Sequence, residues 1–367
     1  MSPFSVSRRE LVEQSNKIYA VATYTHSSSS TPTHKRIQVT TAAEVHCDQQ
    51  QTPPATSTNL LLQQIILMDR YTIQKTIADA LYGQIVLAHD ALTDDVVAIK
   101  KVNVAAATAH TVVRGNHRHV AEDIDMEKQV HRRLSANGGH PNVLRLRGDF
   151  VDHGYDHLVF DFCAGGDLFS RLDDGALPLG VAQRYFGQLV QGVGYMHAQG
   201  VAHRDLSLEN VLIYDDKCCV CDFGLAVPTS ATCKDTVGKP FYMAPEVVQG
   251  IEYDPAKADV WSLGIMLFML LSGIPLWQIA APKDPLFAFV KKQGLRRVTT
   301  AWNLRLDDTV MELLEGMLCM DLTKRFSLAQ VAAHAFVKDC STITNEAQGQ
   351  PSSVKPFATK VVSEMIP

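Results

Sequence analysis

The sequence predicts a bilobal α+β fold, with a small β-rich N-lobe followed by a larger helical C-lobe. Short β-branched runs fall between about residues 71 and 162. From residue 168 to about residue 337, apolar and aromatic residues instead recur at helical spacing. A strand-rich segment followed by a helix-rich one is typical of an α+β arrangement.

Four elements carry this prediction. Two β-branched runs flank a polar turn and predict a hairpin. A stretch with apolar residues on one face predicts a helix, another strand follows it, and a long helix comes after the glycine pair at 165–166. In chain order these are Ile85–Ala88 with Val96–Lys100, Glu122–Leu134, His157–Phe162 and Val181–His197.

Composition is typical of a globular protein. The chain has 367 residues, and its 34 Lys and Arg against 39 Asp and Glu give a formal charge of −5. Hydrophobic residues make up 46 % and charged residues 20 %, which excludes a wholly disordered chain and a polytopic membrane protein. The slight acidic excess argues against a general nucleic-acid binder.

The eight cysteines are irregularly spaced. Cys218, Cys219 and Cys221 crowd together, but no second Cys or His pair follows at the spacing of a zinc site. We therefore expect cysteines of a strand in a reducing compartment, and so a cytoplasmic protein.

The segment from Val260 to Ala281 has no charged residue and is long enough to suggest a transmembrane helix. Its serines, glycines and Pro275 favour the other interpretation, the buried central helix of a large domain with the loop that follows. We therefore expect no membrane span.

The ends of the chain differ from its middle. Residues 1–70 contain the serine run Ser27–Ser30 and the polar stretch Gln49–Pro54, so we expect a disordered tail. Within it, Leu60–Met68 is apolar and could dock as a short helix or strand. Residues 338–367 are polar and predict a C-terminal tail.

Four motifs stand in the order and spacing of the protein-kinase signature set. They are Val97-Ala98-Ile99-Lys100, His203-Arg204-Asp205-Leu206-Ser207-Leu208-Glu209-Asn210, Asp222-Phe223-Gly224 and Ala244-Pro245-Glu246. Over residues 71–337 the chain resembles a eukaryotic protein kinase of the Ser/Thr type, similar to the calmodulin-dependent group. The resemblance implies an N-lobe at 71–162 and a C-lobe at 168–337.

The resemblance implies transfer of the γ-phosphoryl group from Mg·ATP to Ser or Thr hydroxyls of protein substrates. This chemistry needs positioning and charge neutralisation. Lys100 would hold the α- and β-phosphates, paired with Glu127; Glu122 and Asp123 are the alternatives. Asp205 would accept or orient the proton of the substrate hydroxyl. Asp222 and Asn210 would hold Mg²⁺.

The resemblance also implies a nucleotide site between the lobes. Phe160 stands at the gatekeeper position, and the hinge that follows it would pair with adenine through its backbone. The side chains of Ala98 and Leu212 would enclose the base, and Asp167 would reach the ribose. The nucleotide-binding residues implied are Ile77, Ala78, Ala80, Gly83, Ile85, Ala98, Lys100, Asp161, Cys163, Asp167 and Leu212.

The glycine loop departs from the family pattern. Two of its three glycines are replaced by Ala78 and Ala80, and Gly83 remains. Alanine resists positive φ, and its Cβ limits close approach of the backbone to phosphate. We therefore expect weaker or altered nucleotide affinity.

A second departure concerns the catalytic loop. Ser207 stands where Ser/Thr kinases usually carry a Lys that contacts the γ-phosphate, and Lys239 stands where they usually carry a Thr that touches that Lys. One hypothesis is a reciprocal swap in which Lys239 supplies the missing charge from the opposite wall. The alternative is decay at Ser207, with Lys239 a solvated loop residue.

The resemblance further predicts how the activation loop is held. Arg204 marks kinases in which this loop is ordered by a phosphate, and Asp235 stands at the usual phosphate position. The candidate phosphorylation sites are Thr229, Ser230, Thr232 and Thr236. Asp167 and Glu209 hint at a preference for basic substrates, although Met269 replaces the acidic residue that would complete such a pocket.

Three structural contacts are also implied. Glu246 and Arg325 should form a buried ion pair, Asp259 should bond the catalytic-loop backbone, and His203 should stack with Phe223.

Two other functions remain open. The lost glycines and Ser207 would suit a pseudokinase that acts as a scaffold or allosteric partner, and phosphorylation of a small molecule has weaker support. The physiological substrate, upstream activator and oligomeric state are left open.

Overall fold

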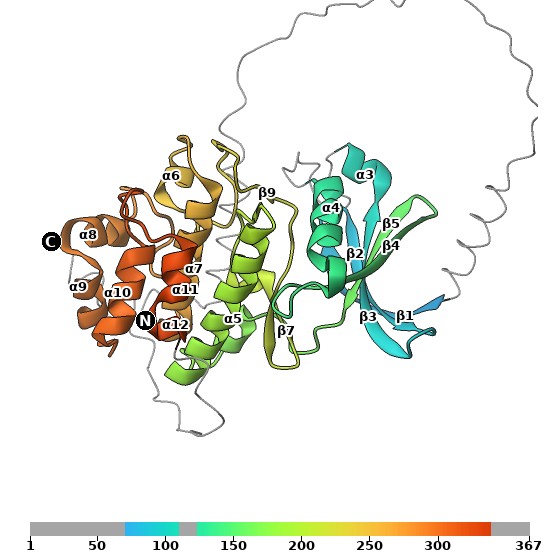
Figure 1. The fold of residues 1–367 in the computed structure, drawn as a ribbon, viewed down its shortest axis with the longest axis horizontal. Helices are drawn as coiled ribbons and strands as arrows, with labels where there is room; N and C mark the ends of the chain where they lie inside the picture. Colours follow the sequence, from blue (N-terminus) through green and yellow to red (C-terminus); the bar gives the residue numbers. More distant parts are fainter. Residues whose placement is uncertain (1–69, 110–122, 339–367) are drawn as a thin grey trace, which may run out of the picture.

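The computed structural model describes residues 70–109 and 123–338. The predictions for both tails, including Leu60–Met68, and for Glu122 lie outside the described residues. Figure 1 shows a twisted sheet with one long helix at one end of the molecule and a larger helical body at the other. The predicted α+β class with two lobes is confirmed.

The smaller lobe is a five-stranded antiparallel sheet in the order β1-β2-β3-β5-β4. The same lobe contains helix α3 (Val104–Thr108), which contacts β3, and helix α4 (Ile124–Ser135), which contacts β4. The strands are β1 (Tyr71–Ala80), β2 (Gly83–Asp90), β3 (Asp95–Asn103), β4 (Leu146–Asp152) and β5 (Tyr155–Asp161). The predicted hairpin is β2–β3, and the predicted strand at 157–162 is β5, shifted by one to two residues.

Helix α4 begins at Ile124, two residues later than the sequence pattern predicts. Asp123 itself has an extended backbone, and its Oδ1 accepts a hydrogen bond from the Met126 amide at 2.9 Å. This N-cap satisfies one of the free amides of the first turn, which fixes the start of the helix.

The pleat of the sheet separates a packed face from a face toward the helical lobe. Ile99 pairs with Val86 and Val159 and lies in the cluster of one face. Because side chains alternate along a strand, Ala98 and Lys100 lie on the other face. Phe160, opposite Ala98, packs there in one cluster with Cys219 of the helical lobe. The sheet thus presents Ala98 and Lys100 toward the junction between the lobes.

The larger lobe is mainly helical and also contains two short two-stranded sheets. Its helices are α5 (Leu179–Ala198), α6 (Pro245–Val248), α7 (Pro255–Ser272), α8 (Pro285–Gln293), α9 (Leu295–Ala301), α10 (Asp308–Met317), α11 (Leu328–Ala333) and α12 (Ala335–Lys338). Its strands are β6 (Val201–Ala202), β7 (Val211–Tyr214), β8 (Lys217–Val220) and β9 (Val227–Pro228). Its short 3₁₀ turns are η2 (Phe169–Leu172) and η3 (Leu208–Asn210), and a third, η1 (Ala136–Gly138), directly follows α4 in the smaller lobe.

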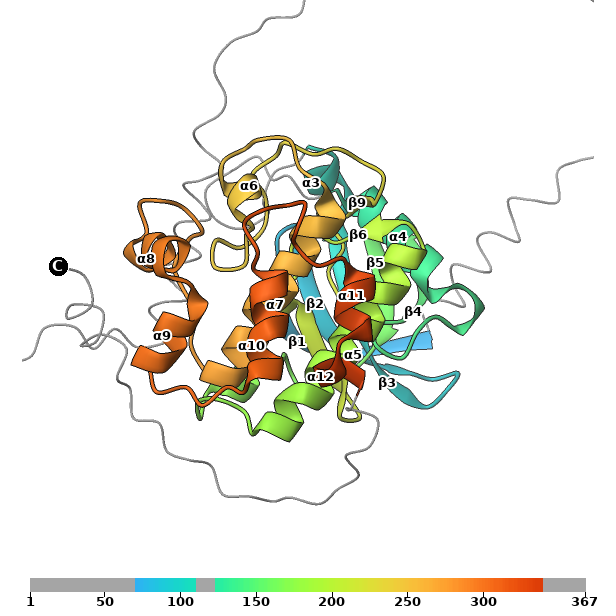
Figure 2. The same ribbon diagram turned by 60° about the vertical axis from the view of Figure 1, so that its left-hand side comes forward.

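Helix α7 forms the centre of this lobe and contacts both α5 and α10 (Figure 2). Asp254 caps its first turn, and Gly273 ends it in the left-handed conformation at φ 75°. By length and composition this helix could cross a membrane, but 89 % of it is buried inside the fold. The prediction of a buried central helix is confirmed.

The predicted ion pair between Glu246 and Arg325 is also confirmed. Arg325 Nη2 donates to Glu246 Oε2 at 3.0 Å, and the Arg325 side chain is fully buried. The Arg325 guanidinium lies 4.9 Å from the centre of the Trp261 ring in α7. The stretch from Asp222 to Glu246 is called the activation segment below. The ion pair therefore fixes α6, at the end of this segment, to α7.

Replacing Glu246 with Gln should lower the free energy of unfolding by about 3–5 kcal/mol, because it leaves the buried Arg325 guanidinium without its counter-charge. Urea denaturation at neutral pH measures this. Glu315→Gln is the matched control: Glu315 pairs with Arg296 at a surface where both side chains are well exposed, so it should cost less than about 1 kcal/mol. Equal losses for the two variants would contradict the role of the buried pair.

Candidate active site

Asp259, in the first turns of α7, fixes the loop that carries the signature residues. Its Oδ2 accepts from the His203 amide at 2.8 Å and its Oδ1 from the Arg204 amide at 2.9 Å, which confirms the predicted contact. Arg204 has φ 66°, in the left-handed region that a non-glycine residue rarely adopts. The Asp259 carboxylate thus holds a strained turn just before Asp205.

The Asp205 carboxylate is held by three donors. Its Oδ1 accepts from the Lys239 amide at 2.9 Å. Its Oδ2 accepts from Asn210 Nδ2 at 2.8 Å and from Lys239 Nζ at 3.1 Å. Two of the donors come from the activation segment and one from the catalytic loop, so both segments orient this carboxylate.

Lys239 and Ser207 lie together, as the swap hypothesis requires. Lys239 Nζ donates to Ser207 Oγ at 2.9 Å, and its side chain is 23 % exposed. Burial lowers the pKa of Lys239, but the nearby Asp205 and Glu209 carboxylates outweigh it and raise the pKa above its usual value. Lys239 is therefore a charged ammonium at the centre of the site and does not extend into solvent.

Lys100 and Glu127 form an ion pair that joins the sheet to α4. Lys100 Nζ lies 2.6 and 2.8 Å from the two Glu127 carboxylate oxygens. The alternative partner Asp123 is occupied as the N-cap of α4. Burial raises the pKa of the Glu127 carboxyl, while Lys100 opposes that shift. The pair places a charged lysine on the sheet face that looks toward Asp222.

Asp222 and Asn210 are brought together at the base of the site. The Cys221 amide donates to the Asn210 carbonyl at 3.0 Å, which sets Asp222 beside Asn210. Burial raises the pKa of Asp222, but Lys100 and Lys239 outweigh it and lower the pKa below its usual range. A carboxylate and an amide oxygen are hard donors of the kind that Mg²⁺ prefers, so the residues present fit this metal.

The glycine loop is a tight hairpin whose alanines are unstrained. Ala80 pairs with Gly83 across a two-residue turn, and neither Ala78 nor Ala80 has positive φ. The two alanines are therefore not held in the positive φ that alanine resists. An added Cβ at Gly83 would lie 2.0 Å from the Lys101 carbonyl oxygen, so this glycine is required for packing of β2 on β3. The predicted change in nucleotide affinity stays a prediction.

At the tip of that hairpin, Tyr82 is turned inward. It is buried in a cluster with Val102 and Ile124, the first residue of α4. The Asn103 amide also donates to the Tyr82 carbonyl at 2.8 Å. The loop is thereby fastened to the sheet and to α4 at its tip, a contact that the motif alone did not reveal.

The other predicted nucleotide-site residues differ in where the structure places them. Ile85 pairs with Lys100 and shares its face of the sheet, whereas Ile77 in β1 is exposed. Asp167 forms a bridge with Leu212, and its carboxylate accepts from the Ser170 amide at 2.8 Å. The Asp167 carboxylate is thus already occupied by a local contact.

The hinge side chains have partners of their own. The Asp161 carboxylate accepts a hydrogen bond from Arg147 Nε at 2.5 Å. Its side chain is therefore separate from the backbone pairing with adenine that the resemblance implies for the hinge. Cys163 is buried, and the pKa of its thiol is raised by a hydrogen bond with Cys219 and by burial. Of the three cysteines predicted to lie in a strand, Cys218 and Cys219 lie in β8, whereas Cys221 comes directly after its last residue, so the prediction was wrong for Cys221.

The activation segment is held by a carboxylate at the predicted position. Arg204 Nη1 donates to Asp235 Oδ2 at 3.2 Å, and Arg204 Nε donates to the Leu225 carbonyl at 2.9 Å. The predicted contact of Asp235 with Arg204 is confirmed. Among the candidate phosphorylation sites, Thr236 donates to the Val247 carbonyl at 3.0 Å, whereas Ser230 and Thr232 are exposed.

His131 is a site residue that the sequence interpretation missed. Its ring lies 4.7 Å from the ring of Phe160 and 4.7 Å from that of Phe223, and Phe223 in turn lies 5.3 Å from His203. The predicted His203–Phe223 contact is therefore confirmed and extended. The position of His131 four residues after Glu127, on the buried face of α4, is the signal that could have found it.

The predicted pocket for basic substrates has fewer available carboxylates than the sequence suggests. Glu209 already accepts a hydrogen bond from the Tyr242 hydroxyl at 2.9 Å. Met269 lies inside α7, 1 % exposed, and supplies no carboxylate.

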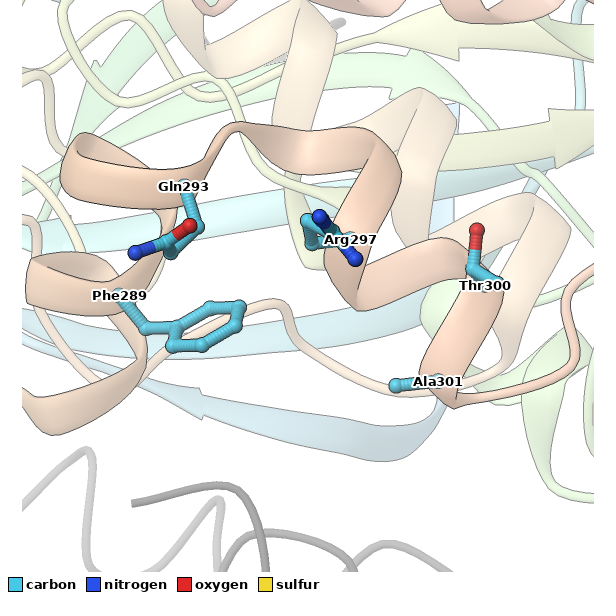
Figure 3. A pocket seen from close by; sticks show the side chains of 5 residues that line it. All are labelled: Phe289, Gln293, Arg297, Thr300 and Ala301. Carbon is cyan, nitrogen blue, oxygen red and sulfur yellow. The ribbon is translucent and has the colours of Figure 1, made fainter. Parts of the chain in front are cut away.

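A separate hollow of about 460 Å³ lies between α8 and α9, lined by Phe289, Gln293, Arg297, Thr300 and Ala301 (Figure 3).

Comparison with known proteins identifies the class. The family model described as "Protein kinase domain" matches residues 71–337. The chain therefore belongs to the protein kinase family.

Individual relatives are Ser/Thr and calcium-dependent kinases by name. "Serine/threonine-protein kinase chk1" of Schizosaccharomyces pombe is 34 % identical over 73 % of this chain and 53 % of its own length. "Calcium-dependent protein kinase 28" of Oryza sativa is 38 % identical over 59 % of this chain and 41 % of its own length. "CBL-interacting protein kinase 26" of the same plant is 34 % identical over 57 % and 41 %. The chain spans about half or less of the length of these curated relatives.

Replacing His131 with Phe should make stability less dependent on pH. Burial lowers the pKa of His131 to about 3, and the charge of Lys100 adds to that shift. The folded state thus stays neutral here while the unfolded chain takes up a proton below about pH 6.5, so stability falls as the pH falls. Because of His131, the wild type should lose about 2 kcal/mol of unfolding free energy between pH 7 and pH 5, and His131→Phe should not show this loss. Urea denaturation at both pH values measures it.

His153→Asn is the control for this comparison. The His153 side chain is 80 % exposed, and Asn tolerates its φ of 44°. If the His131→Phe protein loses as much stability between pH 7 and pH 5 as the wild type does, the neutral buried state of His131 is refuted.

Proposed function

We propose that this chain is a Ser/Thr protein kinase that transfers the γ-phosphoryl group of Mg·ATP to hydroxyls of protein substrates. The observation that carries the proposal is the Asp205 carboxylate, oriented by Lys239 and Asn210 beside the Lys100–Glu127 ion pair. A scaffold would have no need of this complete and charged set. The names of the relatives support the same activity.

The residues act through position and charge. Lys100, held by Glu127, binds the phosphates on the sheet side of the site, while Asp205 accepts the proton of the substrate hydroxyl. Asp222 and the amide oxygen of Asn210 are the groups that would hold Mg²⁺, which supplies positive charge to the phosphates when bound. The backbone of the hinge at 161–163 pairs with adenine, and Ala98 and Leu212 enclose it.

Two aspects of the setting stay predictions. The free cysteines among the described residues suit the reducing, cytoplasmic location expected from the sequence. Protein substrates are the proposed partners, and the calcium-dependent and CBL-interacting relatives suggest that further regulatory partners be sought.

Replacing Asp205 with Asn should lower kcat for a Ser-containing protein substrate by about 10²–10⁴-fold, because Asn keeps the shape of the side chain but accepts no proton. Transfer of radiolabelled γ-phosphate to a generic basic protein measures it. A wild-type protein that transfers no more label than the Asp205→Asn protein would sink the kinase proposal and leave the scaffold function.

Replacing Lys100 with Met should lower kcat/KM for ATP by about 10²–10³-fold, because it removes a cation placed on the phosphates. Lys101→Met is the matched control. Lys101 is the next residue of β3, so its side chain leaves from the opposite face, and its Nζ lies 5.3 Å from the centre of the Tyr155 ring. The control should stay within about threefold of wild type, and similar losses in both variants would contradict the assignment of Lys100.

A further inference from the structure

The Lys239 ammonium contacts two groups of the catalytic loop. Its ammonium lies 3.1 Å from the Asp205 carboxylate and 2.9 Å from the Ser207 hydroxyl. The side chain is mostly buried, and Asp205, Glu209 and Asp222 all favour its charged form. The site therefore contains a second ammonium besides Lys100, next to the group that accepts the substrate proton.

A cation at this point suits the chemistry of the transfer. The substrate hydroxyl oxygen forms a bond to the γ-phosphorus while the bond from that phosphorus to the β–γ bridging oxygen breaks. The electron pair of that bond leaves with ADP, and the hydroxyl proton passes to Asp205. Negative charge is spread over the γ-phosphoryl oxygens in between, and a fixed ammonium beside Asp205 stabilises it.

Lys239 reaches this point from the activation segment. Gly238, just before it, has φ 98°, and an added Cβ there would lie 2.7 Å from the Arg204 carbonyl oxygen. The segment thus runs against the catalytic loop at van der Waals distance. The Lys239 carbonyl accepts from the Tyr242 amide at 3.0 Å, which fixes the turn from the other side.

The same segment is tied down a few residues earlier. Cys233 and Tyr253 exchange two backbone hydrogen bonds at 3.0 and 2.8 Å. The Tyr253 hydroxyl donates to the Asp235 carbonyl at 3.0 Å, and the Asp235 carboxylate meets Arg204. These contacts hold the stretch that leads to Lys239 in place, with the Asp235 carboxylate facing Arg204 at the position where the resemblance implies a phosphate.

We propose that Lys239 supplies, from the activation segment, the cation that stabilises the transferring γ-phosphoryl group, with Ser207 as its acceptor on the catalytic loop. Docking of the segment and completion of the catalytic charge are then one event. The inference rests on the proposed kinase function. It also assigns Ser207 a purpose, since a lysine at that position would meet the Lys239 ammonium.

The test is a cycle of four full-length proteins: wild type, Lys239→Thr, Ser207→Lys and the double variant. Lys239→Thr should lower kcat by about 10²–10³-fold with little change in KM for the protein substrate. The double variant returns one ammonium and one hydroxyl to the same place and should recover kcat to within about tenfold of wild type. Ser207→Lys alone brings two ammonium groups together and should also be slow.

Lys234→Thr is the matched control, a Lys→Thr change on the same segment. The Lys234 side chain is well exposed and contacts Glu252 at 3.2 Å, so its kcat should match wild type. Thermal unfolding of all variants shows whether the fold is kept. A Lys239→Thr protein within about threefold of wild-type kcat, or a folded double variant no faster than Lys239→Thr, overturns the proposal.

A binding measurement separates this inference from the kinase function and also serves if the double variant does not fold. Calorimetry should show that Lys239→Thr weakens Mg·ATP about tenfold and leaves Mg·ADP unchanged, because the lysine meets only the γ-phosphate. Equal weakening of ATP and ADP refutes the contact. If the wild type transfers no phosphate but Lys239→Thr still weakens only the binding of Mg·ATP, the proposed function fails and the contact of Lys239 with the γ-phosphate stands.

Discussion

The arrangement of the site depends on how one carboxylate, that of Asp205, is held. It accepts from a backbone amide and an ammonium of the same residue, Lys239, and from the Asn210 amide group. A carboxylate with three donors in fixed directions has little freedom to rotate, which is the preorganisation that proton transfer requires. Both the catalytic loop and the activation segment must be in place for this set of bonds to exist.

The remainder of the fold supplies that placement. The catalytic loop is anchored through Asp259 to α7, the most deeply buried helix of the larger lobe. The end of the activation segment is anchored to the same helix through Glu246, Arg325 and Trp261. One buried helix is therefore the common reference for both walls of the site.

Helix α4 connects this base to the sheet. Glu127 binds Lys100, and one turn later His131 fills the space between Phe160 of the sheet and Phe223. Because His131 stays neutral there, an apolar contact rather than a charge joins the lobes beside Lys100. The ion pair of Glu127 and the ring contacts of His131 thus lie on the same face of α4.

The motifs were sufficient to predict contacts such as those of Lys100 with Glu127 and of Asp259 with the loop amides, since each of these groups occupies a recognisable place in the chain. They could not predict contacts that arise from packing. Gly83 is needed because of the Lys101 carbonyl across the sheet, and Tyr82 and His131 are defined by neighbours distant in sequence. Strand β4 escaped prediction because Arg147, Gly148 and Asp149 interrupt its apolar pattern.

The central claim is that Lys239 takes part in the charge set of the phosphoryl group. The most direct test is a crystal structure with Mg²⁺, ADP and a planar aluminium fluoride in place of the transferring group. The account predicts Lys239 Nζ at about 2.7–3.1 Å from a fluoride, with Ser207 still in contact. A Lys239 side chain that turns to solvent, with water on the fluoride instead, would contradict it.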